Sequence, residues 1–155
     1  MTIPTSSAPA VRQYLFDQLT ATLTPDADFP SEQLLVCFDE PGPFQPADIV
    51  SIGKVSRQDA VSSMVGSGGP GWLEENYDVD VTIDVFRGGD YPQRVFARSV
   101  ALFDAVCAVV RSDPTLGGAV LSARPTASSH EVAWDDEHKG RHCITPMQIS
   151  CYQRI

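Results

Sequence analysis

The strictest alternation of apolar and polar positions lies between Glu74 and Phe86. The apolar positions of this segment are Tyr77, Val79, Val81, Ile83 and Val85. The positions between them are polar: Glu74, Asn76, Asp78, Asp80, Thr82 and Asp84. Because successive side chains of a strand point to opposite faces, this pattern predicts a half-buried strand with an acidic row on its outer face.

Two segments have helical spacing instead. From about Pro9 to Leu23, apolar residues recur every four positions, which predicts a helix that Ser6 or Ser7 can cap. A longer helix is predicted from Tyr91 to Val110 and ends before Pro114. Arg94 and Arg98 lie one turn apart in it, on a face expected to remain in solvent.

The remaining apolar runs predict further strands. A short run at 33–38 indicates a buried strand, and the runs at 48–55 and 119–124 indicate two more. Residues 131–134 and 143–152 are expected to form a closing hairpin through a polar turn. Pro146 places the last strand at a sheet edge or at a bulge, because proline cannot donate a backbone hydrogen bond.

The order of these elements favours one domain over residues 1–155, with a flexible Gly/Ser-rich loop at about 57–73. No regular alternation of strand and helix is present, so a parallel nucleotide-binding sheet is not expected. The predicted fold class is α+β, with a mainly antiparallel mixed sheet of about five strands and two main helices packed on one face.

Charge and composition exclude several classes of protein. The chain has 20 acidic and 11 basic side chains and a net charge of -9, which disfavours tight binding to DNA, itself a polyanion. No apolar run is long enough to cross a membrane, and the N-terminus lacks the pattern of a secretory signal. We therefore expect a cytoplasmic site of synthesis, where the four cysteines, which have no CxxC spacing, remain reduced and buried.

Candidate chemistry is sparse. His130, His138 and His142 lie near Cys143, but a polar hairpin tip explains them better than a metal site does. No nucleophile elbow and no phosphate-binding loop occur. The sequence therefore favours a protein that is not an enzyme and needs no metal or cofactor. A small metal-dependent hydrolase built on the 130–143 segment, and a DNA-binding regulator, are the alternatives from other classes.

Four segments together carry a family resemblance: AVRQYLFDQL, ENYDVDVTIDVFRGGD, VFARSVALFDAVCAVVRSDPTLGG and CITPMQISCYQRI. With them, the chain resembles the tail-terminator, or minor tail, proteins of long-tailed bacteriophages, particularly those that infect actinobacteria. The resemblance spans most of the chain. Its motifs are patterns of fold and turn and include no catalytic signature.

The resemblance implies a virion protein of the tail or neck, assembled in the host bacterial cytoplasm. Such proteins form a homo-oligomeric ring, usually a hexamer, that sits on the last ring of the tail-tube protein and ends tube polymerisation. The ring later joins the head connector or stopper protein. DNA passes through its lumen without specific binding, and no cofactor or membrane is involved. A head-completion (stopper) protein of the neck and a tail-tube subunit share similar elements and remain alternatives.

Two sets of residues follow from this hypothesis. The outer acidic row of the predicted strand, Asp78, Asp80 and Asp84, is a candidate for a surface that faces the lumen and repels DNA. The candidate contacts with a neighbouring subunit or with the tube are Met64, Trp72, Arg94 and Arg98.

Overall fold

The computed structural model describes residues 5–29, 31, 33–61 and 72–155. Two helices and six strands follow one another in the predicted order. They are α1 (Ala8–Thr22), β1 (Leu34–Phe38), β2 (Asp48–Val61), β3 (Leu73–Gly88), α2 (Pro92–Ser112), β4 (Ser122–Ser128), β5 (Glu131–Trp134) and β6 (Gly140–Arg154). The predicted α+β class is confirmed.

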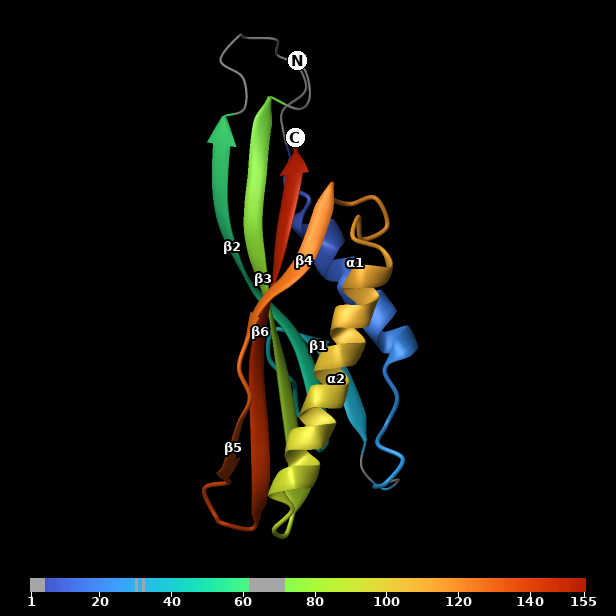
Figure 1. The fold of residues 1–155 in the computed structure, drawn as a ribbon, viewed down its shortest axis with the longest axis vertical. Coiled ribbons are helices and arrows are strands. Elements are labelled where there is room, and N and C mark those ends of the chain that lie inside the picture. Colours follow the sequence, from blue (N-terminus) through green and yellow to red (C-terminus); the bar gives the residue numbers. More distant parts are fainter. Residues whose placement is uncertain (1–4, 30, 32, 62–71) are drawn as a thin grey trace.

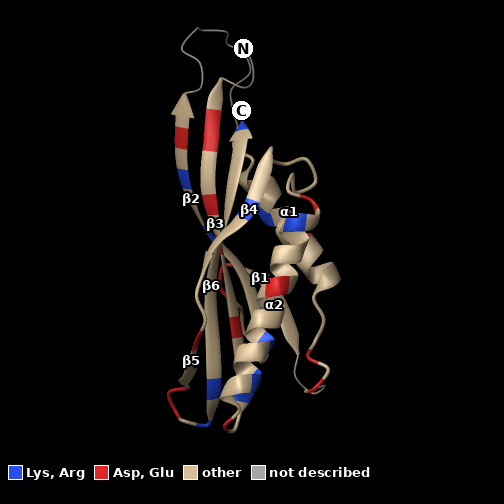
Figure 2. Ribbon diagram, viewed as in Figure 1, with Lys and Arg blue, Asp and Glu red and all other residues tan. Residues whose placement is uncertain are grey.

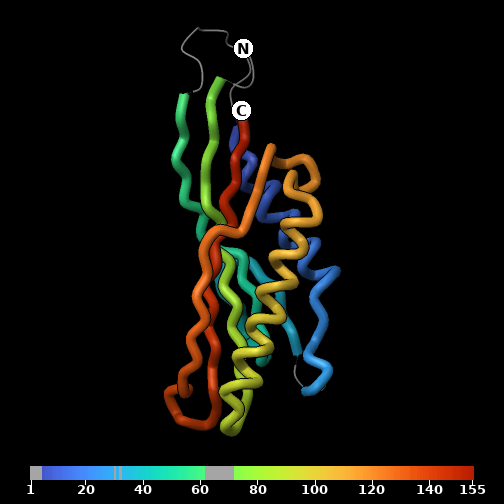
Figure 3. The backbone as a smooth tube through the Cα atoms, in the orientation of Figure 1, coloured from blue at the N-terminus to red at the C-terminus, as the bar shows by residue number. Residues whose placement is uncertain are grey.

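All six strands form one sheet, and both helices pack on the same face of it (Figure 1). The strand order is β1-β2-β3-β6-β4, and β5 pairs with β6 next to β4. β1 runs parallel to β2, whereas every other pairing is antiparallel. The far ends of β2 and β3 reach beyond both helices, as the backbone trace also shows (Figure 3).

β3 is the central strand and carries the predicted alternation. Its apolar side chains from Tyr77 to Val85 are at most 3% exposed, while the acidic side chains between them are half-buried on the other face. The buried row packs against the apolar faces of the helices, and each such valine or isoleucine contributes about 1.5–3 kcal/mol by leaving water. The helix residues of this core include Val11, Leu15, Leu19, Val95, Leu102 and Val106.

The two sheet edges differ from the prediction. The apolar segment 33–38 was expected to be a buried strand, but β1 is the terminal strand and all its residues are half-buried. The last strand was expected at an edge or a bulge, yet β6 lies between β3 and the pair β4 and β5. The first expectation was wrong because an apolar run does not reveal how many strands flank it. The second, which rested on Pro146, was wrong because proline needs only a local gap in the pairing, and the break between β4 and β5 supplies one.

The position of Pro146 explains how an inner strand tolerates proline. β5 pairs with β6 up to Ile144, and β4 begins its pairing at Met147. The carbonyl of Pro146 accepts a bond from the Ser129 N–H on that side, so its ring nitrogen faces the same gap between the two partner strands. No ladder hydrogen bond from this nitrogen is needed there.

Several element boundaries also shift. β2 continues to Val61, so residues 57–61, which the sequence assigned to the loop, are paired strand. The central part of the predicted loop, 62–71, lies outside the described residues. β4 begins at Ser122, a few residues later than expected, because the turn after α2 extends through 119–121.

Candidate functional site

The predicted acidic row alternates along β3 with the apolar row that packs against the helices, so it lies on the opposite face of the sheet. Figure 2 shows acidic positions along β3. Asp78 accepts a hydrogen bond of 2.5 Å from the Ser150 hydroxyl. Asp84 Oδ1 lies 3.0 Å from Nδ1 of His142. Asp80 lies opposite the register shift of β2. The row is therefore a half-buried polar surface held by neighbouring strands, and its exposure to a lumen stays a prediction.

The outer face near Asp78 is hollowed into a shallow polar groove of about 430 Å³. Its walls come from β2, β3 and β6 and include Ser56, Gln58, Asn76, Asp78 and Ser150. Hydroxyl and amide groups dominate these walls, unlike the mostly apolar lining of small-molecule sites. The groove thus offers hydrogen-bonding groups to a neighbouring surface rather than an enclosed site for a substrate.

Of the predicted interface residues that the structure describes, Arg94 and Arg98 line one pocket beside α2, whereas Trp72 does not. Met64 lies outside the described residues. Trp72 is half-buried directly before β3, whereas Arg94 is exposed in the first turns of α2, beyond the opposite end of β3. The guanidinium of Arg94 lies 5.3 Å from the ring centre of Phe29, within the same chain. A role of these residues in contacts between subunits stays a prediction.

Arg98 does not lie on a wet helix face as expected. Its side chain is 13% exposed, and its Nε donates to Asp48 Oδ2 at 2.9 Å. Its Nη2 donates to the Thr24 carbonyl at 2.7 Å. The expectation was wrong because a charged partner on β2 draws this arginine inward, and helical spacing alone does not reveal such a partner.

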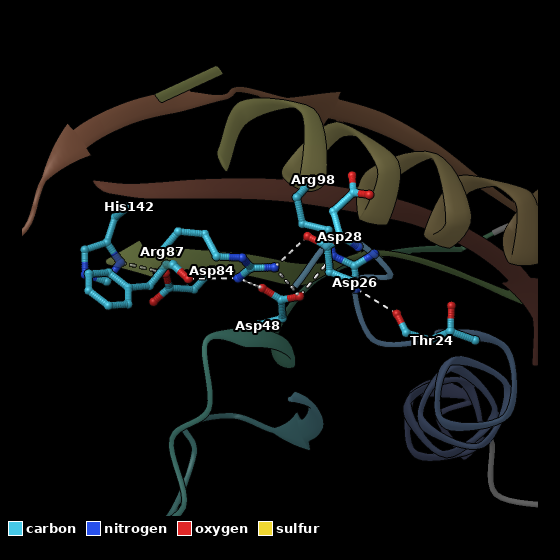
Figure 4. Close-up of polar contacts among 9 residues, drawn as sticks. Thr24, Asp26, Asp28, Asp48, Asp84, Arg87, Arg98 and His142 are labelled. Carbon is cyan, nitrogen blue, oxygen red and sulfur yellow. Dashed lines mark hydrogen bonds and ion pairs between the residues drawn. The ribbon is translucent and has the colours of Figure 1, made fainter. Parts of the chain in front are cut away.

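Asp48 belongs to a buried ion cluster that joins four segments of the chain (Figure 4). Its carboxylate is fully buried and meets Arg87, which is 1% exposed, through two contacts of 2.6 and 3.2 Å. Arg87 also donates to Asp26 Oδ2 at 3.0 Å. With Arg98 on α2, the cluster connects β2, β3, α2 and the segment after α1.

The charges of this cluster are balanced, with two arginines facing two aspartates. Burial alone would raise the pKa of Asp26, but hydrogen bonds from Arg87 and from the Asp28 backbone N–H leave this pKa below its ordinary value. The pKa of Arg87 is raised, because its bonds to Asp48 and Asp26 outweigh the effect of burial. Both shifts favour the charged forms of Asp26 and Arg87, as a buried ion pair requires.

A second buried charge lies at the other end of β3. Glu75 is fully buried, and its Oε1 accepts hydrogen bonds from the Ser7 backbone N–H at 2.9 Å and from the Ser7 hydroxyl at 2.6 Å. Its Oε2 lies 3.0 Å from Arg57 Nη2. Burial alone would raise the pKa of Glu75, but the serine bonds and the Arg57 charge lower it.

The sequence reading missed both buried charges, although the signal was available. Arg87 follows Val85 by two positions, and Glu75 precedes Tyr77 by two, so both fall on the apolar face of β3. A charged residue at a core-facing position needs a buried partner. Their positions in the alternation therefore identify Arg87 and Glu75 as buried charges from the sequence alone. The partners Asp48, Asp26 and Ser7 are distant in sequence and cannot be found in this way.

A third polar cluster joins α2 to β6. The hydroxyls of Ser99 and Thr145 lie 2.5 Å apart, and Thr145 Oγ1 lies 2.8 Å from Nδ1 of His130. The His130 ring packs edge-on against Phe96 and Phe103. Ser99 and Thr145 are fully buried and His130 is half-buried, so the cluster joins the helix to the sheet.

Within the described ranges, no group of three or more His, Cys, Asp or Glu side chains is placed to hold a metal ion. All four cysteines are free, and burial raises the pKa of the Cys151 thiol to about 12. Of the helices that the structure describes, none is long and apolar enough to cross a membrane.

No protein-family model and no curated protein matches the sequence. Among solved structures, the chain is similar to a chain from the virion of a native gene transfer agent particle. The two are 16% identical, the match covers 96% of this chain and 99% of that chain, and the TM-score is 0.49. Such a likeness is too distant to carry a functional argument.

The buried ion cluster gives a matched pair of tests. Asp48→Asn removes one buried charge and leaves Arg87 and Arg98 incompletely neutralised, so we expect unfolding to become easier by about 3–5 kcal/mol. Asp39→Asn breaks the pair with Arg12, in which Asp39 is 67% exposed, and should cost less than about 1 kcal/mol. Urea unfolding followed by circular dichroism measures both. Equal losses in the two variants would contradict the role assigned to the buried cluster.

Proposed function

We propose that this chain is a structural virion protein of a long-tailed phage, a tail terminator that forms a ring at the head-proximal end of the tail tube. The ring ends tube polymerisation and joins the tail to the head connector. Its partners are other copies of this chain, usually six in a ring, the tail-tube protein and the connector or stopper protein. No cofactor and no catalytic step enter this function.

The family resemblance gives the proposal its first support, since its motifs occupy the framework of the fold. ENYDVDVTIDVFRGGD forms the central strand β3 and the turn after it. DPTLGG forms the turn after α2, in which Asp113 accepts bonds from the backbone N–H groups of Thr115 and Gly117. The motifs therefore mark positions that set the architecture, as expected for a protein whose function depends on its shape.

The main structural support for the proposal is a sheet edge at β2 that has no pairing strand among the described residues. β1 ends its pairing at Ile52, so the stretch Lys54–Val61 of β2 pairs with β3 and with no other strand among the described residues. β1 itself is an apolar terminal strand of sequence LLVCF. Monomeric proteins usually protect such edges from pairing with other chains. An edge left open suits a subunit that contacts its neighbours in an assembly.

The opposite side of the sheet is guarded. β4 contains Pro125 and has a register shift between Pro125 and Ala127, two features that hinder pairing with a further strand. The two sides therefore differ, which favours heterologous contacts between unlike surfaces. Contacts of this kind close into rings when the rotation between subunits fits.

The terminator function is tested by tail-tube assembly in vitro. We expect tail-tube protein polymerised with this chain to give tubes of restricted length, each with a ring at one end, because a bound terminator leaves no site for the next tube ring. Negative-stain electron microscopy measures tube length and end structure. As a control, Val61→Lys places an extra charge on the open edge of β2, where Val61 is 54% exposed, and should reduce ring formation without unfolding the chain.

A chain that neither forms rings nor changes tube length would rule out the terminator function. Capture of the head connector, without capture of the tube protein, would instead identify a stopper protein of the neck. Tubes built from this chain alone would identify a tail-tube subunit.

The acidic row provides a second prediction for the assembled ring. If Asp78, Asp80 and Asp84 face the lumen, their charge keeps passing DNA from adhering to the wall. Replacing all three by Lys should slow DNA ejection several-fold, whereas replacing all three by Asn, which removes the same side-chain charges without adding positive ones, should have a smaller effect. Fluorescence of released DNA measures the rate. Intact rings with unchanged ejection in the Lys variant would place the row elsewhere.

A further inference from the structure

The projecting end of the sheet has little apolar support. We call this region the β2–β3 arm and define it as Lys54–Val61 of β2 with Leu73–Tyr77 of β3. Arg57–Val61 pairs with Leu73–Tyr77, and Val55 and Ser56 pair with Val79 and Asp78 at the base of the arm. On its other side the β3 stretch pairs with β6, from Glu74 with Arg154 to Tyr77 with Cys151. Every residue of the β2 stretch except Val55 is exposed. Tyr77 is the last core residue of β3 in this direction, and Val55 packs against the core from β2, so the hydrophobic core reaches only the base of the arm.

At this point Glu75 takes the position that the alternation would give to an apolar residue. It is fully buried although it lies beyond the end of the apolar row. Its carboxylate meets the N-terminus of α1, where the Ser7 backbone N–H and hydroxyl both donate to Oε1. The unpaired N–H groups and the dipole of a helix N-terminus both favour a carboxylate there.

Two further side chains lie next to the contact between Ser7 and Glu75. The Tyr77 hydroxyl lies 2.8 Å from Ser7 Oγ, and Arg57 of β2 lies 3.0 Å from Glu75 Oε2. Arg57 also pairs with Asp59 at 2.9 Å on its own strand. One buried carboxylate is thus bonded to α1 and to β2 while it belongs to β3.

We infer that Glu75 is a positioning residue that clamps the β2–β3 arm to the N-terminus of α1 and so fixes the direction of the open β2 edge. The clamp acts in the free chain, so this inference goes beyond the proposed ring and does not depend on it. Beyond its base the arm is held by backbone pairing and by this clamp, not by the apolar core. Loss of the clamp should therefore loosen the arm, most of all its β2 edge, while the rest of the sheet stays folded.

Hydrogen-deuterium exchange with mass spectrometry tests the clamp on the full-length protein. Glu75→Gln keeps the size of the side chain and removes its charge. We expect the amides of Lys54–Val61 and Leu73–Tyr77 to exchange about tenfold faster or more, because breaking charged hydrogen bonds allows local opening. The amides of Asp48–Ile52 and Val79–Val85 should keep their protection.

Two further variants control this result. Asp59 is the other partner of Arg57, and its side chain is 34% exposed. Asp59→Asn removes this partner and should change exchange in the arm by less than about twofold. Ser7→Ala removes the hydroxyl bonded to Glu75 and keeps the backbone donor, so it should give a smaller release confined to the same amides. Should Glu75→Gln fail to fold, Ser7→Ala decides the question.

The outcomes separate a clamp from general stabilisation. Faster exchange confined to the arm supports the clamp. An equal rise of exchange throughout the sheet, or unchanged exchange in the arm, overturns it. Ring assembly does not enter this measurement, so failure of the clamp and failure of the terminator function are distinguishable.

Discussion

Arg87 and Asp48 form a buried ion pair at the point where four segments of this chain meet. Neither side chain is more than 1% exposed, so each charge depends on the other and on Arg98 and Asp26 for neutralisation. Separating such a pair leaves an uncompensated charge in a medium of low polarity, which is strongly unfavourable. The relative positions of β2, β3, α2 and the segment after α1 are therefore tightly constrained.

A buried charged residue thus stands at each end of the apolar row of β3. Arg87 follows the row and is bonded to Asp26, close to the end of α1. Glu75 precedes the row and is bonded to Ser7, at the start of α1. The helix is consequently fastened at both ends to the central strand, and valine and isoleucine side chains fill the space between. This arrangement fixes the helices on one face, and no helix of the described residues lies on the opposite face.

The bare face and the open edge connect the fold with the proposed function. The free face of β3 carries Asp78, Asp80 and Asp84 among hydroxyl and amide groups, which are compatible with water or with a passing polyanion. The open edge at Lys54–Val61 remains available for contacts between subunits. In the proposed ring, the open edge contacts a neighbouring subunit and the acidic face lines the channel.

The periodicity of apolar residues along the chain predicted many of the helices and strands of this structure. The alternation between Tyr77 and Val85 predicted the central strand, and four-residue spacing predicted both helices, because these periods reflect backbone geometry directly. The pairing partners of Pro146 and of β1 could not be predicted, since they depend on strand order. The inward turn of Arg98 escaped for a related reason: its partner Asp48 lies 50 positions away and becomes a neighbour only through the sheet.

Whether the chain is a component of a virion is the central question. Quantitative mass spectrometry of purified phage particles, made by a host that carries the gene for this chain, answers it most directly. The account predicts that the chain is present in intact particles at the low, fixed copy number of one ring per tail, far below the tail-tube protein. Absence of the chain from purified infectious particles would contradict the account.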